Sequence, residues 1–286
     1  WKKLKQLETG LKTFQTSSKA NILQNNVLSI QVSLSGLSFC ILNLDANTIT
    51  FYKSFAFEKK GNPNDLLDKL IHQFNTEPSL KQSFKSVKVI HENELSALVP
   101  KSLFNEEYLA DYLKFNSKIL RSDFITHDGI SANESVNVYV PYVNINNYIY
   151  DIFGEFVFKH FSTIVLETLL NLEKNATDTK MYAHISNTHF EIVVIKKGQL
   201  LLYNTFDYNT KEDFIYYILF TAEQLELNPE EFPLILLGNI TKDDKFYDIA
   251  YKYVRNVSVL ETKSTYNFES DIDETCSSNF VLTNSF

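Results

Sequence analysis

The chain carries the same pattern of aromatic and apolar residues twice, at an offset of 151 residues. At this offset the members of the first copy, Phe39, Ile41, Tyr52, Phe55 and Phe57, correspond to Phe190, Ile192, Tyr203, Phe206 and Tyr208 in the second. A period this long is typical of a duplicated domain rather than of a solenoid unit. We therefore expect a ligand in the space between the two halves.

The composition is that of a soluble globular protein with room for two domains. The chain has 286 residues, of which 44% are hydrophobic and 22% are charged. Its formal charge of −8 argues against nucleic acid as a partner, because phosphate binding needs a concentrated positive face. No stretch reaches the ~20 apolar residues of a membrane span. Only Cys40 and Cys276 are present, which favours a reducing, cytoplasmic location.

Alternating apolar residues and turn signals predict a three-stranded meander at the start of each copy. In the first copy we expect strands at 27–34, 38–44 and 48–58, a helix that Asn62 and Pro63 open, and a strand at 87–90. In the second copy we expect strands at 181–186, 190–195 and 199–207, a helix at 210–225, a strand at 233–237, a helix at 243–254 and a strand at 257–260. The shared order predicts two mixed α/β halves, each a sheet with flanking helices.

The domain organisation follows from the limits of the two copies. We expect an N-terminal extension with a short amphipathic helix at 1–26, a first half at 27–174, a second half at 180–261, and a polar C-terminal segment at 262–286. The pattern predicts no structure for that last segment. The first half ends in a linking helix at 162–174, with Ser162 as its expected N-cap.

The stretch 93–135 has no counterpart of its length in the second half, so we expect it to form a separate lobe or edge element. Within it the pattern predicts a helix at 105–115 and a strand-like piece at 124–126. After it we expect a strand at 136–140, a helix at 144–153 and an extended segment at 156–160.

A duplicated unit of a meander followed by alternating helices and strands resembles the actin-like ATPase superfamily. This ribonuclease-H-like fold includes sugar kinases, chaperones and ATPases of cell division and pilus assembly. The resemblance is architectural and covers about residues 27–261. At the level of sequence, 28–34 (LSIQVSL), 109–116 (LADYLKFN) and 210–217 (TKEDFIYY) resemble an uncharacterised Bacteroidetes family, domain of unknown function 3822. That family has no established activity, and it too implies an actin-like fold.

The superfamily resemblance implies three nucleotide-contacting turns. In its members the first turn of each half carries Asp-x-Gly, whose glycine lets the backbone approach phosphates and whose aspartate positions Mg²⁺ or water. The corresponding first turns are Ser33, Ser35 and Gly36 in the first half, and Ser186, Asn187 and Thr188 in the second. The third turn implied by the resemblance binds the nucleoside with a pair of glycines after the fourth strand of the second half, where this chain has Gly238 and Asn239. A hydroxyl cannot replace a carboxylate as a metal ligand at neutral pH. We therefore expect a degenerate nucleotide site without a metal or a cofactor.

Two other groupings have weaker chemical meaning. His184 and His189 flank the short second turn, but two histidines without a third ligand do not make a zinc site. His91 and Glu92 end a strand of the first half and could serve in acid–base chemistry. For both pairs the pattern favours solvent-exposed loop positions.

The helix expected at 105–115 is the candidate partner-binding surface. Tyr108, Leu109 and Tyr112 give it an apolar side, and tyrosine is favoured at protein contacts. The alternative is that these side chains pack inward. Without the metal ligands, the sequence favours a non-catalytic binding or scaffold protein that takes a protein partner. The alternative function is a nucleotide-dependent enzyme, an ATPase or small-molecule kinase, with atypical phosphate loops.

Overall fold

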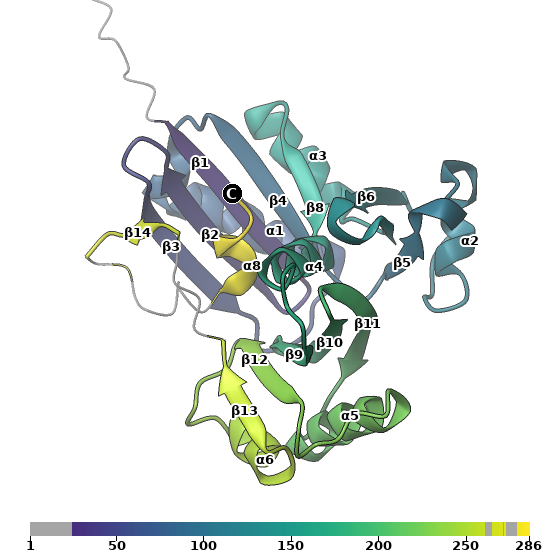
Figure 1. The fold of residues 1–286 in the computed structure, drawn as a ribbon. Coiled ribbons are helices and arrows are strands. Elements are labelled where there is room, and N and C mark those ends of the chain that lie inside the picture. The colour runs from purple at the N-terminus through teal and green to yellow at the C-terminus, as the bar shows by residue number, and fades with distance from the viewer. Residues whose placement is uncertain (1–24, 261–264, 271, 273–278) are drawn as a thin grey trace, which may run out of the picture.

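The computed structural model describes residues 25–260, 265–270, 272 and 279–286, and Figure 1 shows their arrangement. Within these residues the chain forms three β-sheets, two of them large. The N-terminal helix expected within 1–26 falls almost wholly on residues 1–24, which lie outside the described residues, as does Cys276.

The first large sheet has the strand order β14-β3-β2-β1-β4-β8. Its strands are β1 (Asn26–Ser33), β2 (Gly36–Asn43), β3 (Thr48–Ala56), β4 (Ser86–Glu92), β8 (Val157–His160) and β14 (Asn267–Phe268). The helices α1 (Pro63–Thr76) and α3 (Val143–Phe153) pack on one face of this sheet, where Leu66 and Ile145 share a core with Leu28. Asn62 caps α1 and forms the expected start of that helix.

The second large sheet has the strand order β11-β10-β9-β12-β13. Its strands are β9 (Thr179–Ile185), β10 (His189–Lys196), β11 (Gln199–Asp207), β12 (Pro233–Gly238) and β13 (Asn256–Val259). The helices α5 (Lys211–Gln224) and α6 (Lys245–Tyr253) cover its outer face. The two sheets share one strand order: β3-β2-β1-β4-β8 in the first corresponds to β11-β10-β9-β12-β13 in the second. This is the duplicated α/β architecture that the sequence predicts.

The same irregularity marks both meanders. In the first, the β2–β3 register shifts between Ile41 and Leu42, which leaves Thr50 of β3 as an extra, bulged residue. In the second, the β10–β11 register shifts between Val194 and Ile195 and leaves Leu201 as the extra residue. A β-bulge at the same place in both copies supports a common origin for them.

These registers correct the single offset expected from the sequence. On the third strand the offset is 151, and Tyr52 corresponds to Tyr203. On the second strand it is 153, so Phe39 corresponds to Ile192 and the expected match with Phe190 is wrong by two residues. A shift of two keeps the same face of the strand toward the core, because side chains alternate with a period of two. The duplication is therefore unaffected.

A third sheet, with the order β5-β7-β6, forms a lobe that projects from the first half (Figure 1). Its strands are β5 (Ser96–Pro100), β6 (Thr126–Ile130) and β7 (Ser135–Tyr139). We call residues 93–139 the lobe, because the strand expected at 136–140 pairs here and not in the first large sheet. Val99, Leu113 and Val138 belong to a small core of its own.

Two elements expected in the lobe have other bounds in the structure. The helix expected at 105–115 is a single 3-10 turn, Glu106–Tyr108, followed by the short helix α2 (Leu109–Leu113). The strand-like piece expected at 124–126 contributes only its last residue, since β6 begins at Thr126.

The helix α4 (Phe161–Leu172) lies between the two large sheets, together with the short α8 (Phe280–Thr283) (Figure 1). Both helices belong to one core that includes Ile90 from the first sheet and Val193 from the second. The C-terminal segment, for which the sequence predicted no structure, thus supplies a buried helix. None of the described helices is long and apolar enough to cross a membrane.

The expected N-cap of the linking helix is wrong. The helix α4 begins at Phe161, with His160 in the N-cap position. Ser162 lies buried in its first turn, where its hydroxyl is 2.7 Å from His160 Nδ1 and accepts a hydrogen bond from Asn137 at 2.9 Å. A buried serine that binds neighbouring side chains gives the same sequence signal as a capping serine.

Candidate functional site

Seven of the eight residues predicted for the degenerate nucleotide site line one small cavity between the two halves. They are Ser33, Ser35, Gly36, Ser186, Asn187, Gly238 and Asn239. The eighth, Thr188, is exposed on the turn between β9 and β10 and does not line the cavity. Because β1, β9 and β12 all end here, positions far apart in the sequence come together.

The size of the cavity decides what it can hold. Its volume is about 120 Å³, whereas sites for small molecules and cofactors usually occupy about 300–1,000 Å³. Asn279 and Phe280, at the start of α8, form part of its wall, and Phe280 is only 3% exposed. In this arrangement the cavity is smaller than an ordinary nucleotide site.

The serines that replace the two aspartates are engaged within the protein. Ser33 Oγ lies 3.0 Å from Ser35 Oγ and accepts the backbone N–H of Ser35 at 3.2 Å. Ser186 Oγ donates a hydrogen bond of 2.8 Å to Glu92 Oε1. One hydroxyl therefore stabilises its own turn, and the other joins the two halves.

The glycines kept at these turns are required by backbone packing. A Cβ atom at Gly36 would lie 2.7 Å from the carbonyl oxygen of Phe55 on the neighbouring strand. Gly238 has a φ of +89°, and a Cβ atom there would collide with the carbonyl oxygen of Ile185. Only glycine tolerates such a conformation and such a close approach. These two glycines are explained without a phosphate.

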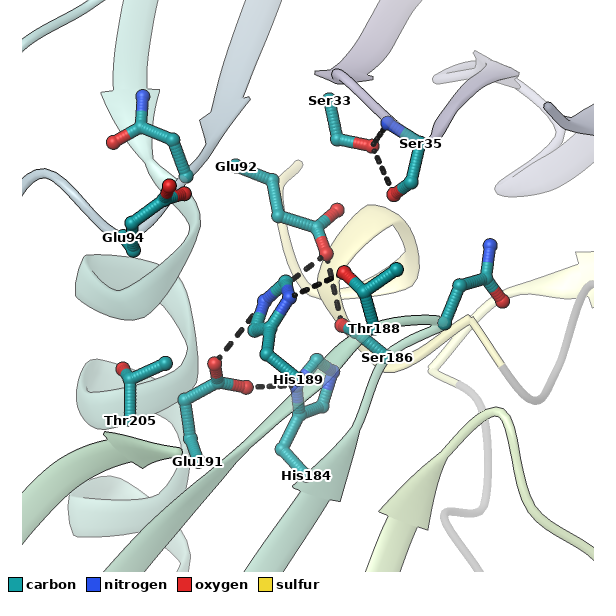
Figure 2. A network of polar contacts seen from close by, with 12 residues as sticks. Ser33, Ser35, Glu92, Glu94, His184, Ser186, Thr188, His189, Glu191 and Thr205 are labelled. Carbon is teal, nitrogen blue, oxygen red and sulfur yellow. Dashed lines mark hydrogen bonds and ion pairs between the residues drawn. The ribbon is translucent and has the colours of Figure 1, made fainter. Parts of the chain in front are cut away.

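Figure 2 shows a buried network of carboxylates and imidazoles beside the cavity. His189 Nε2 lies 3.6 Å from Glu92 Oε1 and 3.3 Å from Glu191 Oε1. The other oxygen of Glu191, Oε2, lies 2.8 Å from His184 Nδ1. Carboxylates and imidazoles thus alternate from the end of β4 in the first half into the second sheet.

The expectation that Glu92 and His184 are exposed to solvent is wrong. The exposed fractions of Glu92, His184 and Glu191 are 7%, 4% and 0%. Glu191 was not among the residues predicted for the site, although its position in the sequence indicates a buried charge. In the expected strand 190–195 it is the single charged residue among apolar ones. Such a carboxylate must be buried with its neighbours and must find a partner there.

His91 does not act with Glu92 as the predicted acid–base pair. Successive residues of a strand point to opposite faces, and His91 faces α3, where its Nδ1 accepts the backbone N–H of Tyr142 at 3.2 Å. Its Nε2 lies 2.9 Å from the side-chain oxygen of Asn146. Burial lowers the pKa of His91 to about 4. This histidine is therefore a neutral structural group.

The residues present do not fit a magnesium nucleotide. Both oxygens of Glu92 accept hydrogen bonds from the chain itself, Oε2 from Gln31 at 2.7 Å and Oε1 from Ser186. Within the part of the chain that the structure describes, no three His, Cys, Asp or Glu side chains are grouped so that they could hold a metal ion. Glu92 also lines the cavity and would face the phosphates with its negative charge.

Three buried polar atoms near the cavity make no hydrogen bond within the described residues: Gln31 Oε1, His189 Nε2 and Glu191 Oε1. The last two are 3.3 Å apart, which is an ion-pair distance, but their alignment does not make a hydrogen bond. The network is therefore incompletely satisfied at its centre, where the two halves meet.

The three predicted partner-binding residues have different environments. Tyr108 is 53% exposed, so the alternative that it packs inward does not hold. Leu109 and Tyr112 are half-buried against the core of the lobe. The Tyr112 hydroxyl donates to the carbonyl oxygen of Leu103 at 2.8 Å and accepts the backbone N–H of Asn105 at 2.9 Å. The Tyr112 hydroxyl therefore links two backbone positions within the lobe.

The lobe nevertheless exposes much apolar surface. Its exposed large hydrophobic residues are Leu103, Tyr108, Phe115, Leu120 and Phe124. They are five of the sixteen such residues among those that the structure describes, and all lie within one segment, 103–124. Phe115 is 82% exposed and Leu120 is 68% exposed. We call these five residues the exposed lobe surface.

The two meanders, the linking helix and the cleft between two mixed sheets define the actin-like ATPase fold. Solved structures with this fold are similar over most of the chain. One is a protein of unknown function with an actin-like ATPase fold from Bacteroides thetaiotaomicron VPI-5482. It is 24% identical with a TM-score of 0.70, over 83% of this chain and 91% of the other. A second is the PilM–PilN type IV pilus biogenesis complex, 11% identical with a TM-score of 0.55, over 90% and 95% of the two chains.

The chain belongs to the family described as "Protein of unknown function (DUF3822)", whose model matches residues 15–257. This confirms the family resemblance seen in the sequence. No curated protein matches the chain. At these identities the solved structures support the fold alone.

Proposed function

We propose that this protein is a non-catalytic binding or scaffold module that takes a protein partner on the exposed lobe surface. The concentration of exposed apolar side chains in 103–124 carries the proposal. Exposed apolar side chains that concentrate in one region of a protein commonly mark an interaction site. Aromatic side chains such as Tyr108, Phe115 and Phe124 are the kind that dominate binding energy in interfaces.

The cleft supports the same proposal from another direction. Its glycines are needed for backbone packing, its serines are engaged, and its cavity of about 120 Å³ is smaller than an ordinary nucleotide site. One of the similar solved structures is the PilM–PilN complex, in which a protein is assembled with a partner. An actin-like fold can therefore serve as a platform for a partner, because the fold does not dictate the chemistry.

The proposal keeps the domain limits expected from the sequence, with halves at 27–174 and 180–261. It also keeps a cytoplasmic location, which the small number of cysteines supports. Nucleic acid is not expected as the partner, since the net charge is −8.

Affinity capture with matched variants tests the proposal. The bait is the intact chain, and the test variant combines Phe115→Ser with Leu120→Ser. The control variant combines Leu44→Ser with Leu172→Ser, which changes two apolar side chains of 40% and 57% exposure away from the lobe. Captured proteins from a lysate of the source organism are quantified by mass spectrometry.

We expect at least one protein to be enriched by the intact chain and by the control, and reduced about tenfold by the lobe variant. Equal capture by the lobe variant, or no enrichment over empty resin, would contradict the proposal. Circular dichroism of each variant verifies that the comparison is made between folded proteins.

A further inference from the structure

Two free sheet edges line one groove between the lobe and the second half. Among the described residues, β5 pairs only with β7, and β11 pairs only with β10, so each strand ends its sheet. The groove has a volume of about 690 Å³. It is lined from the β5 side by residues 94–98, from the lobe by 116–118, and from β11 by Tyr203, Asn204, Thr205 and Asp207.

The pattern of hydrogen bonds between β11 and β10 shows which backbone groups of β11 point to its free edge. The backbone N–H of Tyr208 donates to the carbonyl oxygen of Thr188 on the turn before β10. In an antiparallel pair, bonded and non-bonded residues alternate. Thr205 is therefore a non-bonded position, and its N–H indeed donates to the Asn204 side chain at 3.0 Å instead. Tyr203, Thr205 and Asp207 thus turn their backbone groups outward, and all three line the groove.

The same reasoning fixes the phase of β5. The N–H of Val140 donates to the carbonyl oxygen of Leu95, and the N–H of Lys101 donates to that of Glu134. Leu95 and Lys101 are thus hydrogen-bonded positions. Because bonded and non-bonded positions alternate, the even-numbered residues of β5 turn their backbone groups away from β7. Ser96 and Leu98 therefore offer free backbone groups, and both line the groove. Pro100 has no N–H to offer, so this edge ends there.

We propose that the groove binds an extended peptide segment of the partner, which adds as a strand to the free edge of β11. This inference rests on the proposed partner-binding function. A strand fills about 4.8 Å by 10 Å in cross-section and rises about 3.3 Å per residue. The groove therefore accommodates about four extended residues. Main-chain hydrogen bonds supply the affinity of such a peptide, and the side chains at the groove supply its specificity.

The charges of the groove select the chemistry of the peptide. Asp207 is exposed and forms no ion pair among the described residues. Glu94, at the β5 side, is exposed and forms an ion pair with Lys60 at 3.2 Å. Lys118 is the single basic residue of the lining. A peptide with a lysine or arginine among small or β-branched residues complements this lining best.

Figure 2 shows Glu94 and Thr205 on the side of the buried network that is away from Ser33 and Ser35. The groove is therefore a different site from the degenerate nucleotide cavity, and none of its lining residues is shared with that cavity. A peptide bound in the groove would contact the lobe and the second half together.

The probe is a fluorescein-labelled, end-capped heptapeptide of alternating threonine and valine with one central lysine. Its counterparts carry a central glutamate, or N-methyl groups on alternate amides that remove the hydrogen-bond donors of one edge. Binding to the full chain is measured by fluorescence anisotropy. Thr205→Pro removes only an outward N–H and leaves the β10 ladder intact, whereas the control Thr205→Val keeps this donor.

We expect the lysine peptide to bind, and the N-methylated peptide and the Thr205→Pro variant each to weaken binding about tenfold. Thr205→Val should bind like the original chain. Asn204→Ala should bind more tightly, because it uncovers the Thr205 donor. If Thr205→Pro does not fold, Asp207→Lys provides the test, since it should reverse the preference from the lysine to the glutamate peptide.

Three results would overturn the inference: no binding of the lysine peptide up to about 1 mM, equal binding of the N-methylated peptide, or concentration-dependent dimers that Thr205→Pro abolishes without any peptide binding. The last result would assign the edge to a second copy of the chain. If the lobe variant loses a captured partner while no peptide binds, the groove is wrong and the proposed function stands. If the peptide binds while the lobe variant captures as much of the partner as the intact chain does, the assignment of the partner site to the exposed lobe surface is wrong.

Discussion

The Ser186 hydroxyl, at the end of β9, donates a hydrogen bond of 2.8 Å to the Glu92 carboxylate, at the end of β4. This bond joins the second half of the molecule to the first beside the cavity between them. Ser186, at the position where the superfamily resemblance implies the second aspartate, therefore links the two halves.

Removing that donor should destabilise the protein. Ser186→Ala leaves the buried Glu92 with one hydrogen bond fewer, and a bond to a charged group contributes about 1.5–3 kcal/mol. Thr188→Ala, two residues away and exposed, should change the free energy of unfolding by no more than about 0.5 kcal/mol. Denaturant unfolding measures both, and equal stabilities would show that the bond between the halves contributes nothing.

The backbone of Gly238 should not tolerate a side chain. Its φ of +89° and the nearby carbonyl oxygen of Ile185 make Gly238→Ala strained, at a cost of about 2 kcal/mol or more. Gly129→Ala is the matched control, since nothing lies within 4 Å of a Cβ atom there. Thermal unfolding compares the two, and a Gly238→Ala protein as stable as the control would be inconsistent with the packing account.

Stability should fall in mild acid because of two buried histidines. Burial lowers the pKa of His91 to about 4, and burial together with the neighbouring His91 lowers that of His160 to about 3. The unfolded chain takes up these protons near pH 6.5, whereas the folded protein does not. Between pH 6.5 and pH 5 each histidine should therefore cost about 2 kcal/mol of unfolding free energy.

Denaturant unfolding at several pH values measures this slope. His91→Gln should lower the slope by about half, whatever it does to stability at pH 7.5. An unchanged slope in the variant would mean that another group causes the acid sensitivity.

The fold was predictable from the sequence because its signals are local. Turn residues and alternating apolar positions define both meanders, and capping residues such as Asn62 and Thr210 define the helices after them. The failures have physical causes. The turn between β2 and β3 (44–47) is two residues longer than the turn between β10 and β11 (197–198), and this difference changes the offset from 153 on the second strand to 151 on the third. The helix α8 has only four residues and is stable because it is buried between the sheets, which no local pattern records.

The candidate site was predicted only in part. The resemblance to actin-like ATPases located the turns that meet at the cavity, because strand ends converge in that fold. It did not locate Glu191, whose importance depends on burial beside His184 and His189. It also could not show that Tyr112 is used inside the lobe while Phe115 is exposed, since both are aromatic residues of one short segment.

The central proposal, that the cleft does not bind a nucleotide, is tested most directly by thermal unfolding with and without Mg-ATP. A nucleotide at 100 times its Kd would add about 2.7 kcal/mol to the free energy of unfolding and raise Tm by several degrees. We predict no change in Tm with ATP or ADP, in magnesium or in EDTA. A saturable rise in Tm that requires magnesium, and that Ser33→Ala or Asn239→Ala reduces, would contradict the account and favour a nucleotide-dependent enzyme.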